Sequence, residues 1–365
     1  MTHSTPKKPY GPGDTVHVLP CDERTSTDGY WDNSRQPALT VRSGDIVEVE
    51  TGIHLSMKPG APLADWAAAF RRLMGDIPDV YILEDPATGA ERLRKGAGHH
   101  HLTGPIHVEG ALPGDVLQVE ILHIEPYPYG FNLNPQASFL PLGLLPDDFP
   151  EGGMRWYELD PATGTYEFQP GVTVKARPFP GSIGVEMAAP GKWSNVPPGR
   201  HGGNMDNKEL CAGTVLYLPV QVPGAGLKTG DSHLAQGNGE VNLNAVEGAF
   251  KCISLRLTVR KDLGAIVDWP MASTPEHWVL MGFHTNLEEA AKMAVRRSIG
   301  FLNAYYGMEK GEAYAFCSQA VDFNITQLVD YTKGVHGLIP KACFTGGQFA
   351  GKNGLTLVPG GLKAG

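Results

Sequence analysis

Runs of alternating apolar residues occur throughout the first two thirds of the chain, and a glycine turn opens four of them. These runs follow Gly13, Gly44, Gly114 and Gly213, and a fifth run spans 250–259. Alternation with a period of two predicts β-strands with one buried face. The spacing between the runs is irregular, which argues against a solenoid or a propeller.

Helical spacing is confined to a few segments. Residues 62–74 begin at a proline and carry apolar side chains at helical spacing. Residues 286–307 form the strongest predicted helix, because a capping asparagine opens the segment and a glycine closes it. A shorter helix is predicted at 311–320, and alternation returns at 321–329.

These elements predict a mainly β fold with α+β additions, in which a β-sandwich-like core of short strands carries a few C-terminal helices. We expect a β-rich core domain over 1–260 and an α+β part over 261–365 packed on the same core. Residues 126–173 are rich in proline, glycine and aromatic residues and show little periodicity. We expect an irregular excursion there, of the kind that forms lids or subunit contacts.

Composition and charge narrow the functional classes. Of the 365 residues, 41% are hydrophobic and the net charge is −9, which argues against nucleic acid or an anionic membrane as the main partner. The first residues contain no apolar signal-peptide stretch, and no window is apolar enough for a membrane helix. The five cysteines form no C-x-x-C pair, so we expect buried free thiols and a cytoplasmic location.

The candidate chemistry lies in two polar segments, "RHGGNMDNK" at 200–208 and "TGDSHLAQGNGE" at 229–240. Each would make a poor core strand, and each alone is typical of a polar surface turn. Side chains two residues apart share a face of an extended chain, as in the two segments' N-x-D and D-x-H patterns. If residues 223–230 turn the strand 214–222 back as a hairpin, the two segments meet.

Convergence of these segments would place two aspartates, a histidine and a glutamate together. Such a mixed nitrogen and oxygen site suits Zn²⁺ or another divalent ion with an open position for water. Three consecutive histidines stand at 99–101. They cannot all face one ion, because neighbouring side chains of a strand point to opposite faces. A loop without function is one interpretation; in the other, His100 points into a cleft.

Four blocks of the sequence resemble the acetamidase/formamidase family. They are "HLTGPIHVEGALPGD" (101–115), "PFPGSIGV" (178–185), the stretch from "HGGNMDNKEL" to "TGDSHLAQGNGE" (201–240), and "VDFNITQLVD…GVHGLIPKACF" (321–344). The resemblance runs from about residue 40 to residue 344 in the family's order. One position departs from it, because the family usually carries aspartate where this chain has Asn238.

The resemblance implies a β-sandwich-like homo-oligomer that hydrolyses a small amide, linear or cyclic and including lactams, to a carboxylate and ammonia or an amine. A bound divalent metal, Zn²⁺ or alternatively Ca²⁺, would activate the water. We expect metal ligation by Asp206, Asp231 and His233, with Glu240 as general acid/base. We expect the remaining polar residues to hold the amide or complete the shell: Asn204 and Gln236 for the amide, and His100 or His201 for the shell or the oxyanion.

Two other interpretations of these segments are consistent with the sequence. The site could hold Ca²⁺ or a small ligand without chemistry, since acids and amides are also calcium ligands. The glycine-acid turns could instead be structural caps of a β-sandwich. The amide is not determined either. We expect its selection by aromatic residues of the 126–173 segment, unless they form a subunit contact: Tyr127, Tyr129, Phe131, Phe139, Trp156 and Tyr157.

Overall fold

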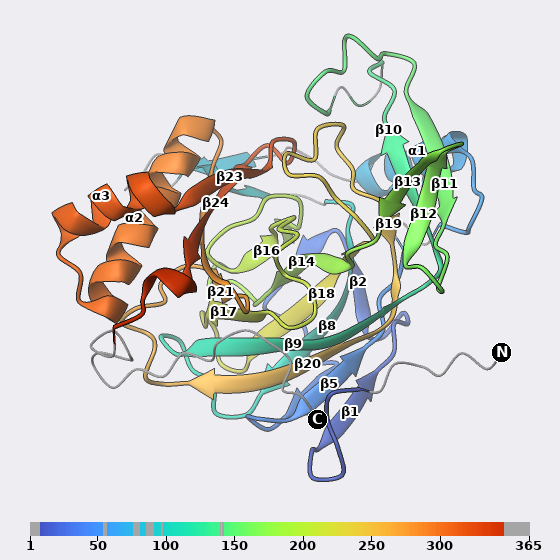
Figure 1. Ribbon diagram of the computed structural model, residues 1–365. Coiled ribbons are helices and arrows are strands. Elements are labelled where there is room, and N and C mark those ends of the chain that lie inside the picture. The colour runs from blue at the N-terminus through green and yellow to red at the C-terminus, as the bar shows by residue number, and fades with distance from the viewer. Residues whose placement is uncertain are drawn as a thin grey trace.

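The computed structural model describes residues 8–53, 57–75, 81–84, 91–95, 98–138, 140 and 142–346. Among these residues, the strands form two nine-stranded sheets and two smaller ones. Figure 1 shows the two large sheets packed across the middle of the molecule, with helices only at its margins. The predicted fold class is confirmed.

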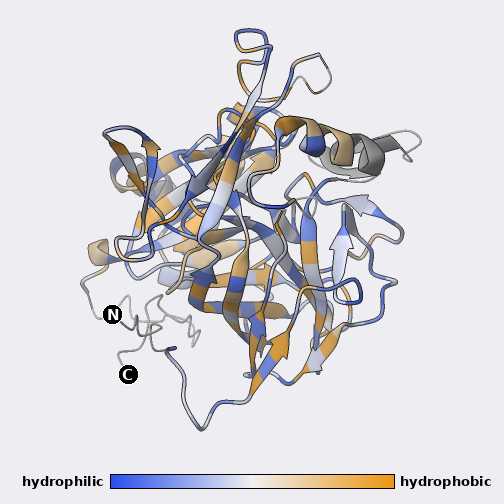
Figure 2. Ribbon diagram, turned by 90° about the vertical axis from the view of Figure 1, so that its right-hand side faces the viewer, coloured by the Kyte–Doolittle hydropathy of each residue, from blue (hydrophilic) through white to orange (hydrophobic). Residues whose placement is uncertain are grey.

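Sheet A is the larger continuous path and holds the strands that alternation predicted. The runs after Gly13, Gly44, Gly114 and Gly213 and the run 250–259 become five adjacent strands at one end of it. Its order is β1 (Val16–Leu19), β5 (Ile46–Val49), β20 (Phe250–Arg260), β9 (Val116–Pro126), β17 (Val215–Pro219), β21 (Met271–Ser273), β22 (His277–His284), β24 (Lys333–Pro340) and β23 (Asp322–Gln327). Orange and blue segments alternate along several strands in Figure 2, as expected for strands with one apolar face.

Sheet B faces sheet A and contains most of the strands that alternation did not predict. Its main path is β11 (Gly153–Glu158), β10 (Tyr129–Asn134), β19 (Glu247–Gly248), β18 (Ala225–His233), β14 (Phe179–Gly184) and β16 (Gly202–Asn204). Three further strands extend it. β8 (His101–Val108) pairs with β18, and both β2 (Ser26–Asp28) and β4 (Leu39–Val41) pair with β8. The small sheets are β12 (Thr165–Gln169) with β13 (Val172–Lys175), and β3 (Tyr30–Trp31), β15 (Trp193–Ser194), β7 (Glu91–Lys95) and β6 (Tyr81–Glu84).

The main core fills the space between the two sheets. Leu216 and Leu218 of β17 pack there in one cluster with Ile183 of β14 and Leu227 of β18. The alternate residues of β17, Val215 and Tyr217, belong to a second cluster beneath the C-terminal helices. The expectation of one buried face is therefore wrong for β17, because helices cover the outer face of sheet A at this point.

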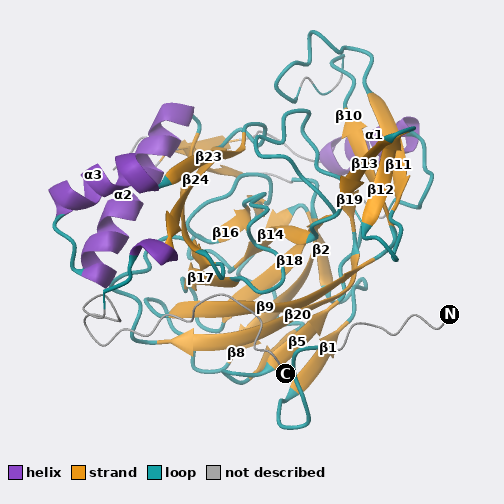
Figure 3. Ribbon diagram, in the orientation of Figure 1, coloured by secondary structure: helices purple, strands orange, loops and turns teal. Residues whose placement is uncertain are grey.

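The helices match their predicted positions. α1 (Leu63–Gly75), α2 (Leu287–Tyr306) and α3 (Lys310–Ala320) are the α-helices of the described residues, and Figure 3 shows them at the margins. The Asn286 side chain accepts hydrogen bonds from two amides of the first turn of α2. Gly307 closes the same helix in the left-handed conformation. A short 3₁₀ turn (Lys341–Cys343) follows β24.

Residues 126–173 are more regular than expected, because they contain the hairpins β10–β11 and β12–β13. Phe139 lies outside the described residues. No helix of the described chain is long and apolar enough to cross a membrane. All five cysteines are free thiols as predicted, but only Cys252 and Cys317 are buried.

Close packing of α2 on β22 depends on a glycine. A Cβ at Gly282 would collide with the backbone oxygen of Ala290 and lie 2.6 Å from the nitrogen of Ala294. We expect Gly282→Ala to lower the free energy of unfolding by about 1–3 kcal/mol through overpacking, measured by urea denaturation. Gly300→Ala is the control, since Gly300 is exposed in α2 with open space around it. It should raise stability by about 0.5–1 kcal/mol; equal effects of both changes would contradict this packing.

Candidate active site

Three strands of sheet B bring the two polar segments together. β14 pairs with β18 on one side, where Phe179 lies opposite His233, and with β16 on the other, where Ser182 lies opposite Asn204. The amides of Met205 and Asp206 both donate to the Gly181 carbonyl oxygen. The segments predicted to meet therefore lie on either side of β14.

The route by which they meet differs from the predicted hairpin. β17 pairs with β9 and β21 in sheet A, whereas β18 pairs with β8, β14 and β19 in sheet B. Residues 220–224 thus carry the chain from one sheet to the other. The first part of "TGDSHLAQGNGE" is also no surface turn, because every residue of β18 is buried. Its polar side chains are tolerated there because they contact one another.

Gly181 leaves the space in which the polar side chains converge. A Cβ at this position would lie 2.6 Å from Cε1 of His233, 2.7 Å from Oδ2 of Asp231 and 2.8 Å from Oδ1 of Asp206. Real Cβ atoms do not approach other atoms this closely. The absence of a side chain at Gly181 is therefore a condition for the arrangement.

Two groupings with the spacing of a metal site share the imidazole of His233. One is Asp206, His233 and Glu240, and the other is Asp231, His233 and Glu247. In each grouping one donor atom per residue lies within 4.8 Å of the others, and all five residues are buried. His233 Nε2 lies 3.3 Å from Glu247 and 3.6 Å from Asp231, while Nδ1 lies 3.7 Å from Asp206.

Glu247 was missed by the sequence analysis. It occupies the two-residue strand β19, which pairs with β18 beside His233. The stretch "NAVEGAF" has no motif that announces a site. A single acid between apolar and small residues was the available signal, because a carboxylate in such a setting is rarely buried without a partner.

Asp330 is a second residue that the sequence analysis missed, and it lies against the Asp206 carboxyl. Its loop is held to the Glu240 segment by two backbone hydrogen bonds. The Gly239 amide donates to the Thr326 carbonyl oxygen at 3.0 Å, and the Leu328 amide donates to the Gly239 carbonyl oxygen at 3.1 Å. The C-terminal block thus joins the site although it is about ninety residues away in sequence.

Burial and mutual repulsion set the protonation of this cluster. Burial raises the pKa of Asp206 and of Glu240 well above the carboxyl range, and neighbouring carboxylates add to both shifts. Burial also raises the pKa of Asp330 to about 6. Burial opposes a charge on His233, yet Glu247 and Asp231 outweigh it and raise its pKa well above the usual value. The cluster therefore favours bound positive charge.

Gln236 determines which nitrogen of His233 faces which grouping. Its Nε2 donates to the Asp206 backbone oxygen at 2.8 Å, so its Oε1 is the atom 3.0 Å from His233 Nδ1. An amide oxygen only accepts, so Nδ1 carries the proton. His233 Nε2 is then the nitrogen available to a metal, and it faces Asp231 and Glu247.

The backbone at three of the acids is strained. Asp206, Asp231 and Glu240 have φ angles of 48°, 48° and 47°, in the left-handed region. Residues with a Cβ rarely adopt this conformation, which costs about 1–3 kcal/mol each and is concentrated at functional sites. Three such residues in one cluster are typical of a functional site, and they argue against a purely structural cap.

The other predicted residues lie at different distances from the cluster. His100 Nε2 is 3.7 Å from Asp231 Oδ2, and His100 Nδ1 donates to the Asn195 backbone oxygen at 3.1 Å. Asn204 accepts a hydrogen bond from Ser182, whose hydroxyl also lies 3.4 Å from Asp231. His100 and Asn204 therefore border the site.

His201 and Asn238 take part in neither grouping. The His201 ring packs edge-on against Trp31, and burial lowers its pKa to about 3, so the imidazole is neutral. The Asn238 side chain is exposed and lies 3.5 Å from Asn324 of β23. Among the three consecutive histidines, His101 pairs with Asp28, away from Asp231.

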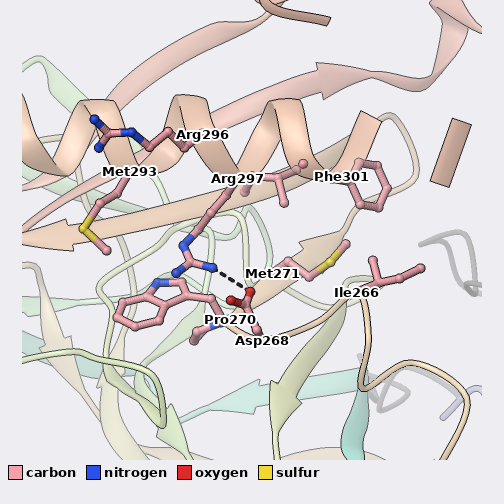
Figure 4. A pocket seen from close by; sticks show the side chains of 11 residues that line it. Ile266, Asp268, Pro270, Met271, Met293, Arg296, Arg297 and Phe301 are labelled. Atoms are coloured by element: carbon pink, nitrogen blue, oxygen red, sulfur yellow. Dashed lines mark hydrogen bonds and ion pairs between the residues drawn. The ribbon is translucent and has the colours of Figure 1, made fainter. Parts of the chain in front are cut away.

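A cavity of about 390 Å³ lies between α2 and the strands β21 and β22 (Figure 4). Its one described carboxylate, Asp268, pairs with Arg297 at 2.7 Å. The same guanidinium lies 4.4 Å from the ring centroid of Trp269. Since Arg297 engages this carboxylate and no histidine or cysteine is among the described lining residues, this cavity is a weaker candidate for acid–base chemistry than the cluster around His233.

Comparison with known proteins identifies relatives over most of the chain. The sequence profile of the Acetamidase/Formamidase family matches residues 90–193 and 185–346. The chain is 31% identical over 201 residues to a formamidase of Methylophilus methylotrophus, covering 41% of this chain and 49% of that protein. It is 29% identical over 209 residues to an acetamidase of Mycolicibacterium smegmatis, covering 41% of this chain and 52% of that one. The chain thus spans about half the length of the curated relatives it matches.

The fold is shared with solved structures over nearly the whole chain. A crystal structure of an acetamidase from Bacillus halodurans superposes with a TM-score of 0.73 at 26% identity. That superposition covers 90% of this chain and 98% of the other. The two-sheet architecture that carries the cluster is therefore common to both proteins.

Gly181→Ala tests whether the void in β14 is required. We expect the variant to fold, because the φ of Gly181 is not in the left-handed region. The new methyl group should push His233, Asp231 and Asp206 apart, so binding of an added divalent ion, measured by calorimetry, should weaken at least tenfold. Gly237→Ala, next to the cluster in open space, is the control. Unchanged affinity in Gly181→Ala would refute this view of the site.

Proposed function

Because this chain belongs to the acetamidase/formamidase family, we propose that it hydrolyses the C–N bond of an amide to a carboxylate and ammonia or an amine. The observation that carries the proposal is the buried cluster of acids around His233, formed by the residue blocks that the family shares. A cluster of this kind can hold a divalent ion and move protons beside it.

The residues fit a divalent ion. Glu240 Oε2 and both carboxylate oxygens of Asp206 are buried and receive no hydrogen bond from an N–H or O–H donor of the described residues. Buried acids without donors are expensive unless a proton or a nearby cation compensates them. An ion held by the second grouping, on the other side of the same imidazole, would lie close enough to do so. When bound, such an ion polarises the amide carbonyl and lowers the pKa of a water molecule.

We assign the ligands from the orientation of His233. Its Nε2 nitrogen would bind the ion together with Asp231 and Glu247. This set differs from the sequence-based one, since Glu247 takes the place of Asp206. A histidine nitrogen with two carboxylates favours Zn²⁺ over Ca²⁺, which prefers oxygen ligands. His100 Nε2, close to Asp231, is placed to complete the shell or to donate to the oxyanion.

Glu240 is our general acid/base. Its raised pKa and its position beside Asp206 and Asp330 suit a group that accepts a proton from water and returns it to the departing nitrogen. Burial raises the pKa of Glu240, and the nearby carboxylates of Asp330 and Glu247 add to the shift, so the basicity of Glu240 is high. In this assignment the grouping on the Nδ1 side of His233, with Glu240, transfers protons, and the grouping on the Nε2 side, with Asp231 and Glu247, binds the ion.

The amide residues divide into two roles. Asn204 borders the site with its oxygen engaged by Ser182, so its NH₂ group is placed to donate to the substrate carbonyl. Gln236 uses both ends of its amide on His233 and on the Asp206 backbone. We therefore assign Gln236 to positioning the imidazole rather than to substrate binding.

Ammonia release from formamide and acetamide, with added Zn²⁺, tests this function. We expect the wild-type protein to be active and Glu240→Gln to lose at least about 100-fold in kcat, the usual contribution of a general acid/base, while keeping its metal. Asn238→Asp is the control, because position 238 lies outside the cluster. Activity that survives in Glu240→Gln would remove Glu240 from the mechanism. A wild-type protein that binds metal but releases no ammonia would instead support the non-catalytic metal-binding alternative.

Metal content distinguishes the two ligand assignments. We expect Glu247→Ala to lose the ion, since one of three ligands disappears, and Asp206→Asn to retain it. Inductively coupled plasma mass spectrometry after dialysis measures the metal-to-protein ratio. The reverse pattern, with the ion retained in Glu247→Ala and lost in Asp206→Asn, would restore the sequence-based ligand set.

A further inference from the structure

A cavity of about 560 Å³, here called the side pocket, lies beside the acid cluster. The β12–β13 hairpin and the residues that follow β18 contribute much of its lining. Its volume is within the range of sites for drug-sized ligands. Formamide and acetamide, the smallest amides, would leave most of it unfilled.

The floor of the side pocket is the outer side of the acid cluster. Gln236 lines the pocket and contacts His233 and Asp206. Asn244 also lines it, and its Nδ2 lies 3.2 Å from Glu247 Oε1. Two amide side chains therefore separate the pocket from both groupings. If the amide of a substrate reaches the cluster between these two side chains, the remaining atoms of the substrate lie in this pocket.

The walls of the side pocket are aromatic on one side. Tyr157 packs on Tyr166 with ring centroids 4.9 Å apart, and Phe168 stacks on Tyr157 at 6.1 Å. Arg155 covers this group, with its guanidinium carbon 5.4 Å from the Tyr157 ring centroid. Phe168 is 43% exposed, so the wall offers apolar surface to a ligand.

The lining of the side pocket also contains cationic residues. Lys175, Arg177 and Lys208 line the pocket, and no carboxylate is among its described lining residues. Arg177 is occupied by Glu209, with Nη2 and Oε2 2.7 Å apart, which leaves the two lysines. The chain as a whole carries a net charge of −9. The side pocket is therefore positively charged, although it lies next to a cluster of acids in a protein with a net negative charge.

We propose that the side pocket binds the far end of an amide substrate that carries a carboxylate there, such as a monoamide of a dicarboxylic acid. Lys175 and Lys208 pair with that carboxylate, and the aromatic wall covers the linker. The acids of the cluster repel the anionic end, so the neutral amide is the end that enters the centre. This inference rests on the proposed amide hydrolysis and names its substrate class.

The test compares pairs of amides of equal length, one ending in a carboxylate and the other in a methyl group. With linkers of increasing length, we expect the wild type to prefer the charged member at one length, through a lower KM. In Lys175→Gln and Lys208→Gln the ratio of the two kcat/KM values should fall about tenfold, since one charge-assisted contact is lost. Lys261→Gln is the matched control, because Lys261 pairs with Asp115 and does not line the pocket.

The possible outcomes separate the substrate class from the reaction itself. If neutral amides are hydrolysed and the charged ones show no preference at any length, the pocket assignment is wrong while the amidase function stands. If no amide is hydrolysed, the proposed function fails. Calorimetry with glutarate as the probe then tests the pocket alone. Salt-sensitive binding that weakens in Lys175→Gln and Lys208→Gln supports the pocket, and an absence of binding overturns it.

Discussion

The need to hold several carboxylates out of water around one imidazole is the constraint on which the structure depends. At an effective dielectric constant of about 20, two like charges about 4 Å apart repel by about 4 kcal/mol. Asp206, Asp231, Glu240, Glu247 and Asp330 are all buried within one such cluster. The raised pKa values of Asp206, Glu240 and Asp330 relieve part of this repulsion. The backbone holds the five acids from different segments: the turn after β16, β18, the segment that pairs with β23, β19, and the loop after β23.

The strands of sheet B hold the acids together because they contain glycine and polar residues in place of the usual apolar ones. Their backbones approach one another so closely that side chains would not fit at several positions, as at Gly184, whose Cβ would lie 2.6 Å from the His201 carbonyl oxygen. The same closeness brings the acids within reach of His233. Sheet A supplies the compensating apolar contact, with strands such as β17 buried on both faces. One sheet thus provides stability, and the other provides the site.

This division explains what the sequence could predict. Alternation revealed six strands of sheet A, including β23, and capping residues revealed α2, because ordinary packing dictates those residues. The strands β14, β16 and β18 were hidden, because glycine and polar residues there serve the cluster instead of the core. The proximity of Asp206, Asp231, His233 and Glu240 was predictable from spacing and family resemblance. The proximity of Glu247 and Asp330 was not, since it comes from pairings between distant segments that leave no local pattern.

The left-handed backbone at Asp206, Asp231 and Glu240 has a consequence for how this protein tolerates change. Glycine adopts this backbone conformation without strain, so replacing one of these acids by glycine relieves about 1–3 kcal/mol of conformational strain while it removes a side chain of the cluster. Directed evolution that selects only for thermal stability or expression would therefore replace these site residues first. Any attempt to stabilise this protein therefore has to measure its activity at the same time, because stability and function oppose each other at the same three positions.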